Sequence, residues 1–75
     1  MTEPKHAVIL VYSTSHAMRI ERMLKDANID CKLIPVPRQL SSDCGVCVRF
    51  LLADKEKVVH CLNSGRIEIQ GVFEI

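Results

Sequence analysis

The sequence has few aromatic residues and no marked excess of charge of either sign. Its 75 residues include two phenylalanines, one tyrosine and no tryptophan, and the formal net charge is +1. Proteins that bind nucleic acid usually carry a basic stripe or patch, often with aromatic side chains that stack on bases. The composition therefore argues against a nucleic-acid-binding protein.

Long apolar runs are also absent from the sequence. No stretch approaches the roughly 20 apolar residues that a membrane-spanning helix needs, and the first five residues, Met1 to Lys5, are too polar for a secretory signal. We therefore expect no membrane partner and a cytoplasmic location. In that compartment the four cysteines are expected to be reduced thiols and not a disulfide framework.

The remaining composition is that of a small globular protein. Apolar residues make up 48% of the chain and charged residues 25%. A chain of this length is close to the lower limit at which one hydrophobic core suffices. We therefore expect a single domain that spans residues 1–75.

Hydrophobic periodicity predicts six elements in the order strand, helix, strand, strand, helix, strand. The predicted strands cover residues 6–12, 31–36, 46–53 and 67–75. The first helix is expected to follow the serine and threonine residues at 13–15 and to end near Asn28. In so short a chain this order predicts an α+β fold of the ferredoxin-like βαββαβ type, a four-stranded antiparallel sheet with both helices on one face.

Several local features of the second half of the chain follow from residue type. Asp54 is expected to cap the second helix and Gly65 to end it, while Gly71 is expected to form a bulge in the last strand. The apolar stripe of the second helix is expected to consist of Val58, Val59 and Leu62.

The loop between the second and third strands is the segment whose residues indicate a reactive site. Pro35 and Pro37 remove backbone donors, so the strand must end there, and Gly45 permits a close or left-handed backbone beside Cys44. The predicted topology places this loop at the same end of the sheet as the N-terminus of the first helix. Because a helix N-terminus and nearby cations lower the pKa of a thiol, we expect Cys44 to be reactive.

The groups expected around a charged sulfur at Cys44 are hydroxyls, cations and turn residues from the ends of these elements. They are Arg38, Ser41, Ser42 and Gly45 of the loop, Thr14, Ser15 and His16 at the first helix, and Arg66 before the last strand. His6 and His60 have no such constellation around them in the sequence. Since no catalytic triad, glycine-rich phosphate loop or carboxylate pair is recognisable, the sequence does not support a turnover enzyme with its own acid-base pair, and we expect no cofactor.

The other cysteines leave alternatives open. Cys44 and Cys47 have the C-x-x-C spacing of dithiol redox sites and of half a metal site. A regulatory or binding module could therefore hold Cu(I) or Zn(II) with these two thiols, and Cys47 could equally be a small apolar strand residue. Cys31 and Cys61 are interpreted as buried thiols.

Residues 37–45, with the pattern PRxxSSxCG, followed by Arg49, resemble the Se/S carrier protein-like family of small prokaryotic proteins. The resemblance extends over residues 13–17, the helix with Glu21 and Leu24, and residues 33–37. It implies that Cys44 accepts sulfur or selenium from a donor protein as a persulfide or selenide adduct and passes it to an acceptor protein. Cys47 departs from the family pattern of small or apolar residues; it is either incidental or a resolving thiol that releases the cargo by forming a disulfide with Cys44.

The sheet face without helices is expected to be apolar. With Cys31 and Leu33 facing the helices, the opposite face receives Ile34, Val36, Cys47, Leu51 and one set from the first strand, either Ala7, Ile9 and Val11 or Val8, Leu10 and Tyr12. Polar side chains on this face come only from Lys32, Arg49, Glu68 and Gln70. An apolar patch of this kind indicates an interface, so we expect a homodimer packed sheet face to sheet face.

Overall fold

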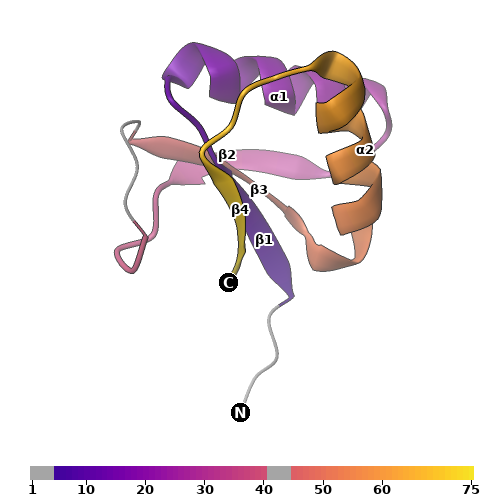
Figure 1. Cartoon of the computed structure of the whole chain (residues 1–75). Coiled ribbons are helices and arrows are strands. Elements are labelled where there is room, and N and C mark those ends of the chain that lie inside the picture. Colours follow the sequence, from indigo (N-terminus) through magenta and orange to yellow (C-terminus); the bar gives the residue numbers. More distant parts are fainter. Residues whose placement is uncertain (1–4, 41–44) are drawn as a thin grey trace.

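The computed structural model describes residues 5–40 and 45–75, and Figure 1 shows the arrangement of the elements. These described residues form four strands, two α-helices and one short 3-10 helix, η1. Their bounds are β1 (His6–Leu10), α1 (Thr14–Asp26), β2 (Cys31–Pro35), β3 (Val46–Leu51), η1 (Leu52–Asp54), α2 (Lys55–Gly65) and β4 (Gly71–Glu74). This sequence of elements confirms the predicted α+β fold. Within the described ranges, neither helix is long and apolar enough to cross a membrane.

The four strands form one sheet in the order β2-β3-β1-β4, and every neighbouring pair is antiparallel. The strand β2 therefore lies at an edge. This position explains how Pro35 can pair with Val46 in the sheet, because an edge strand needs hydrogen-bond donors on one side only. At the end of β1, Leu10 pairs with Cys47 of β3 on one side and with Gly71 of β4 on the other.

All four strands are shorter than predicted, β2 by one residue, since it ends at Pro35. The strand β1 ends at Leu10, since the next residues turn toward the cap of α1, and β3 gives way to η1 at Leu52. The strand β4 begins at Gly71 and not at Ile67, because residues 67–70 form the connection from α2 back to the sheet. Apolar residues in these connections gave the sequence pattern of a strand, but they do not pair with a neighbouring strand in the sheet.

The two glycine predictions had different outcomes, and the one for Gly71 was wrong. The helix α2 ends at Gly65, as predicted, and the left-handed cap after it is Arg66, with φ of 51°. Gly71 pairs in regular register with Leu10 and forms no bulge. A Cβ atom at Gly71 would lie 2.8 Å from the ring of Phe73, so the glycine makes room for that ring.

The second helix also differs from its prediction in two side chains. Asp54 occupies the N-cap position, but its side chain makes no capping hydrogen bond, because η1 leads the chain directly into the helix. Val59 is 36% exposed and lies off the buried stripe. Cys61 packs against the core instead, since it is three residues from Val58 and so shares its face with Val58 and Leu62.

The main core lies between the sheet and the helices. The helices α1 and α2 contribute to one apolar cluster. The set Ala7 and Ile9 of β1, with Val11 directly after it, also belongs to this cluster, which resolves the alternative left open by the sequence. We refer to this cluster as the main core; its fully buried members include Ile9, Ile20, Leu24, Val48, Phe50 and Val58.

A second, smaller cluster lies on the opposite face of the sheet. Val8, Leu10 and Cys47 are buried there. They are packed against partly buried apolar residues that come from β2, from the segment after it and from the end of the chain: Ile34, Val36, Leu40 and Ile75. The chain therefore covers much of the face that the sequence predicted to be open, and we refer to this group as the second core.

Candidate functional site

The strand register brings three connections to one end of the sheet. The end of β1 at Leu10 lies beside the start of β3 at Cys47 and the start of β4 at Gly71. The turn into α1, the β2–β3 loop and the connection from α2 therefore all lie at this end (Figure 1). This confirms the predicted placement of the loop relative to the N-terminus of the first helix.

The β2–β3 loop is closed at its base by the backbone. The Val36 amide donates to the Gly45 carbonyl at 3.1 Å, and the Leu40 amide donates to the Pro37 carbonyl at 3.0 Å. Gly45 is exposed, and a Cβ atom there would meet no described atom within 4 Å. The backbone freedom expected of this glycine beside Cys44 stays a prediction, because Cys44 lies outside the described residues.

Three of the predicted site residues, Ser41, Ser42 and Cys44, lie outside the described residues. Arg38, in the described part of the loop, is exposed. Among the described residues the structure gives one ion pair, between Glu21 and Lys25, so Arg38 has no ion-pair partner there.

The first turn of α1 is held by Ser13. Its Oγ accepts a hydrogen bond from the His16 amide at 3.4 Å and lies 2.7 Å from Nδ1 of the same histidine. His16 is therefore tied to the cap and half-buried, whereas Thr14 and Ser15 are exposed. No acidic residue occurs in this first turn, so the positive end of the helix dipole is not offset by a carboxylate of the helix.

Cys47 is fully buried in the second core. Its Sγ lies 4.0 Å from the carbonyl oxygen of Pro35 across the β2–β3 pair. A thiol in this position can reach a partner in the loop only if the residues that cover it move apart.

A comparison with family models assigns the chain. Residues 6–74 match the model described as "Putative Se/S carrier protein-like". The chain belongs to this family. The match confirms the resemblance seen in the sequence, and it includes both cysteines of the C-x-x-C segment. No curated protein matches the chain.

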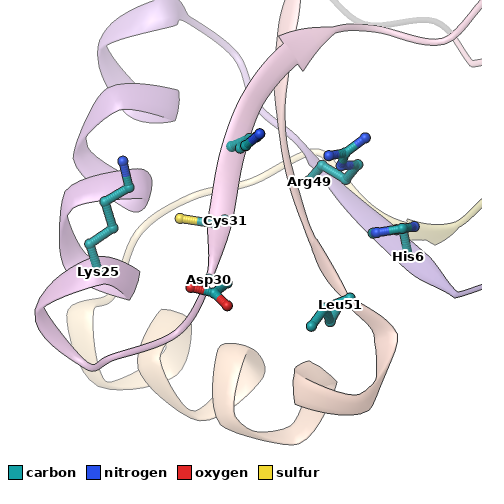
Figure 2. A pocket seen from close by; sticks show the side chains of 7 residues that line it. His6, Lys25, Asp30, Cys31, Arg49 and Leu51 are labelled. Atoms are coloured by element: carbon teal, nitrogen blue, oxygen red, sulfur yellow. The ribbon is translucent and has the colours of Figure 1, made fainter.

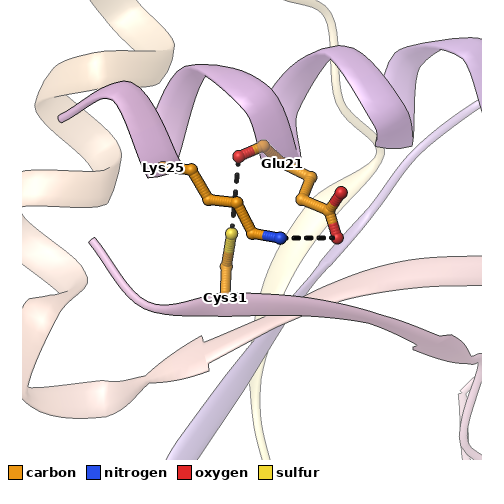
Figure 3. Close-up of polar contacts among 3 residues, drawn as sticks. All are labelled: Glu21, Lys25 and Cys31. Carbon is orange, nitrogen blue, oxygen red and sulfur yellow. Dashed lines mark hydrogen bonds and ion pairs between the residues drawn. The ribbon is translucent and has the colours of Figure 1, made fainter. Parts of the chain in front are cut away.

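In this Se/S carrier protein-like chain, Cys31 is a buried structural thiol (Figure 3). Its Sγ donates to the backbone oxygen of Glu21 at 3.5 Å, beneath the 3.8 Å ion pair between Glu21 and Lys25. Burial raises the pKa of the Cys31 thiol, the negative charges of Glu21 and Asp30 raise it further, and Lys25 opposes them. Cys31 is therefore a protonated thiol at neutral pH. This confirms its interpretation as a buried residue.

Metal ligation gains no support from the part of the carrier-like chain that the structure describes. There, no three His, Cys, Asp or Glu side chains are grouped so that they could hold a metal ion. Cys61 is half-buried against the main core. The metal site suggested by the sequence would depend on Cys44, which lies outside the described residues.

Sequence reasoning missed a cavity of about 310 Å³ at the end of the sheet opposite the loop (Figure 2). Charged side chains dominate its lining: Lys25, Asp30, Lys32 and Arg49, with His6 beside them. His6, around which the sequence showed no constellation, therefore lies among charged side chains in the folded chain. The feature that points to this cavity is the cross-strand pairing of Lys32 with Arg49. This pairing can be recognised only when the register of β2 and β3 is known.

Proposed function

We propose that this protein carries a sulfur or selenium atom on Cys44, which it accepts from a donor protein and delivers to an acceptor protein. The observation that carries the proposal is the family match over residues 6–74, whose description names selenium and sulfur as the cargo. The protein acts as a carrier and has no turnover chemistry of its own. Cysteine thiols stay reduced in the cytosol, so a cytoplasmic location is part of the proposal.

The loading step is an exchange between thiol and persulfide. The thiolate of Cys44 attacks the outer sulfur of a donor persulfide, a new S–S bond forms on Cys44, and the donor S–S bond breaks. The donor leaves as a thiolate that takes up a proton. The cargo sulfur keeps its oxidation state, so no external oxidant or reductant is needed.

The surroundings described at this end of the sheet support an anionic sulfur species. The first turn of α1 has no carboxylate and presents the exposed hydroxyls of Thr14 and Ser15. Arg38 is exposed and has no ion-pair partner among the described residues. Cations, hydroxyl donors and a helix N-terminus all stabilise a thiolate or persulfide relative to its protonated form.

Direct transfer to the acceptor is the favoured release step. A resolving thiol at Cys47 would attack the inner sulfur of the adduct, form a disulfide with Cys44 and expel sulfide, which would leave both cysteines oxidised. The complete burial of Cys47 argues for a packing role in the resting protein. Its resolving role stays a prediction that requires the second core to open.

The test is the intact mass of the protein after incubation with a persulfide donor. Wild type should gain one sulfur atom, Cys44→Ser should gain none, and Cys47→Ala should gain sulfur like wild type. Cys61→Ser is the matched control and should also load normally. Failure of wild type to gain sulfur, or equal gain by Cys44→Ser, would sink the proposal. Tight Cu(I) binding that is lost in Cys47→Ala, without sulfur loading, would favour the metal-binding module instead.

Two further inferences concern the framework that holds the loop. The strand order, the antiparallel pairing and the shared core of α1 and α2 support a ferredoxin-like plan with both helices on one face. A homodimer through the opposite face stays a prediction. Less apolar surface is available for it than the sequence indicated, because the second core already buries Val8 and Leu10. The large apolar side chains on this face that stay exposed are Leu51 and Phe73, each 41% exposed.

A further inference from the structure

Two cations are direct cross-strand partners on the sheet face that carries the second core. Lys32 of β2 pairs with Arg49 of β3, and Arg49 pairs in turn with Val8 of β1. Side chains that are directly opposite in an antiparallel pair have Cβ atoms about 4.5–5.5 Å apart, and like charges there destabilise the sheet. Neither cation has an ion-pair partner among the described residues. In the protein without a ligand, the repulsion between Lys32 and Arg49 therefore lowers the free energy of unfolding.

A third basic group lies next to this pair. His6 of β1 pairs with Leu51, two residues along β3 from Arg49, so His6 and Arg49 are diagonal neighbours on the same face. Figure 2 shows both side chains over this part of the sheet. Arg49 is half-buried, which limits the water available to screen its charge, and the half-buried imidazole of His6 offers a further polar group beside it.

These three groups line the cavity of about 310 Å³, which lies at the lower end of the size range of small-molecule sites. Leu51 supplies an apolar wall, and Asp30 is the one acidic residue among the described lining residues. Lys25 also lines the cavity, but its charge is already paired with Glu21. Positive charge that is not paired within the described chain therefore converges on a space that a small ligand can enter.

We propose that this cavity binds a small oxyanion of the phosphate class, either free or as the phosphoryl group of a small metabolite. A guanidinium presents a planar fork that matches two phosphate oxygens, and an ammonium adds a compact charge beside it. An anion between Lys32 and Arg49 replaces their mutual repulsion with two attractions. The stability lost in the free protein is regained on binding, and the site is separate from the described base of the β2–β3 loop at the other end of the sheet.

The first test is a titration of isotope-labelled protein with inorganic phosphate, followed by amide chemical shifts at ionic strength held constant with chloride. We expect saturable shifts at residues 6, 32 and 49. Arg49→Gln and Lys32→Gln should each weaken binding by about tenfold, the effect of losing one charge-assisted hydrogen bond. Lys57→Gln, which removes an exposed lysine of α2, is the matched control and should bind like wild type.

The same titration with glycerol 3-phosphate distinguishes the two sources of the anion, since tighter binding of the monoester indicates a metabolite and tighter binding of inorganic phosphate indicates the free ion. No saturable shift with either probe would overturn the proposal. Equal affinity in wild type and Arg49→Gln, or saturable shifts confined to the first turn of α1, would do so as well.

A second readout does not depend on locating the ligand. At low salt without phosphate, Lys32→Gln should melt at a higher temperature than wild type, because the like-charge pair is gone. Added phosphate should raise the melting temperature of wild type and of Lys57→Gln but leave that of Lys32→Gln almost unchanged. An equal rise in Lys32→Gln would show that phosphate acts elsewhere and would contradict the proposal.

Discussion

Cys31, Cys47 and Cys61 are chemically identical side chains in three different environments. Cys31 donates to a backbone oxygen of α1 beneath an ion pair, Cys47 is enclosed by the second core, and Cys61 lies half-exposed on α2. The reactive form of cysteine is the thiolate, which burial in apolar surroundings disfavours. Burial therefore separates structural thiols from any thiol that could exchange sulfur with another protein.

The raised pKa of Cys31 predicts a stability change at alkaline pH. In the unfolded chain this thiol titrates near its ordinary value of 9.0, whereas in the folded protein it holds its proton to higher pH. The folded state then binds more protons, so the free energy of unfolding is constant near neutral pH and falls as the pH rises above about 9. The slope for one such group is at most about 1.4 kcal/mol per pH unit.

Urea denaturation of wild type and Cys31→Ala from pH 7 to pH 10.5 measures this effect. The difference between the two proteins should shrink above pH 9, because the variant lacks the titrating thiol. Cys61→Ala is the control and should run parallel to wild type. A difference that stays constant over the whole range would contradict the prediction.

At the scale of one helix, the Ser13 cap is expected to stabilise the first turn of α1, which carries the predicted site residues Thr14 and Ser15. Ser13 accepts from the His16 amide and also contacts the imidazole of that residue. Ser13→Ala should therefore lower the free energy of unfolding by about 1 kcal/mol, the usual value of an N-cap side chain. Ser15→Ala removes the side chain of an exposed serine two residues later and should change stability by less than about 0.5 kcal/mol. If Ser13→Ala and Ser15→Ala lower the free energy of unfolding equally in denaturant melts, the side chain of Ser13 gives no capping stabilisation of its own.

The segment after β2 acts as a cover for Cys47. Leu40 packs on the second core from the turn that the Pro37 carbonyl closes. Leu40→Ala should weaken this cover by about 1 kcal/mol and so raise the rate of native-state alkylation of Cys47 about fivefold. The rate is measured by peptide mass spectrometry in a Cys44→Ser background. Leu51→Ala, which truncates an exposed leucine on the same face, should leave the rate unchanged.

If both leucine variants label Cys47 at the wild-type rate, Leu40 does not control access to this thiol. A resolving role for Cys47 would then need a different opening. Faster labelling in Leu40→Ala together with sulfide release from the loaded protein would support the resolving mechanism.

At the scale of the whole molecule, the two sheet faces have different partners. The main core is covered by α1 and α2, and the second core by short apolar segments of the same chain. Lys32, Arg49, Leu51 and Phe73 occupy the rest of the second face. This face therefore combines a basic cavity with a small exposed apolar area.

Association through this face can be tested by sedimentation of the reduced protein. The homodimer predicts concentration-dependent sedimentation that Leu51→Glu abolishes, whereas Val59→Glu, at an exposed valine of α2, keeps it. Because Lys32 and Arg49 of both copies would approach each other, association should weaken at low salt, where repulsion is less screened. A monomer at high micromolar concentration would rule the dimer out.

The sequence by itself determined the order of the strands and α-helices, and it placed Cys31 and Leu33 on the helix-covered face of the sheet and Cys47 on the opposite face. These features depend on local periodicity, which the chain carries whatever its tertiary partners. Pro35 indicated the end of a strand for the same local reason. The resemblance around Cys44 identified the family, which the match over residues 6–74 confirmed.

The tertiary structure alone decided which side chains meet. The set from β1 that faces the helices, the burial of Cys47 beneath Leu40 and Ile75, and the pairing of Lys32 with Arg49 all depend on strand register and on segments distant in sequence. A shift of one residue in register would exchange the two faces of a strand. Periodicity cannot fix that choice, because both faces of β1 are apolar.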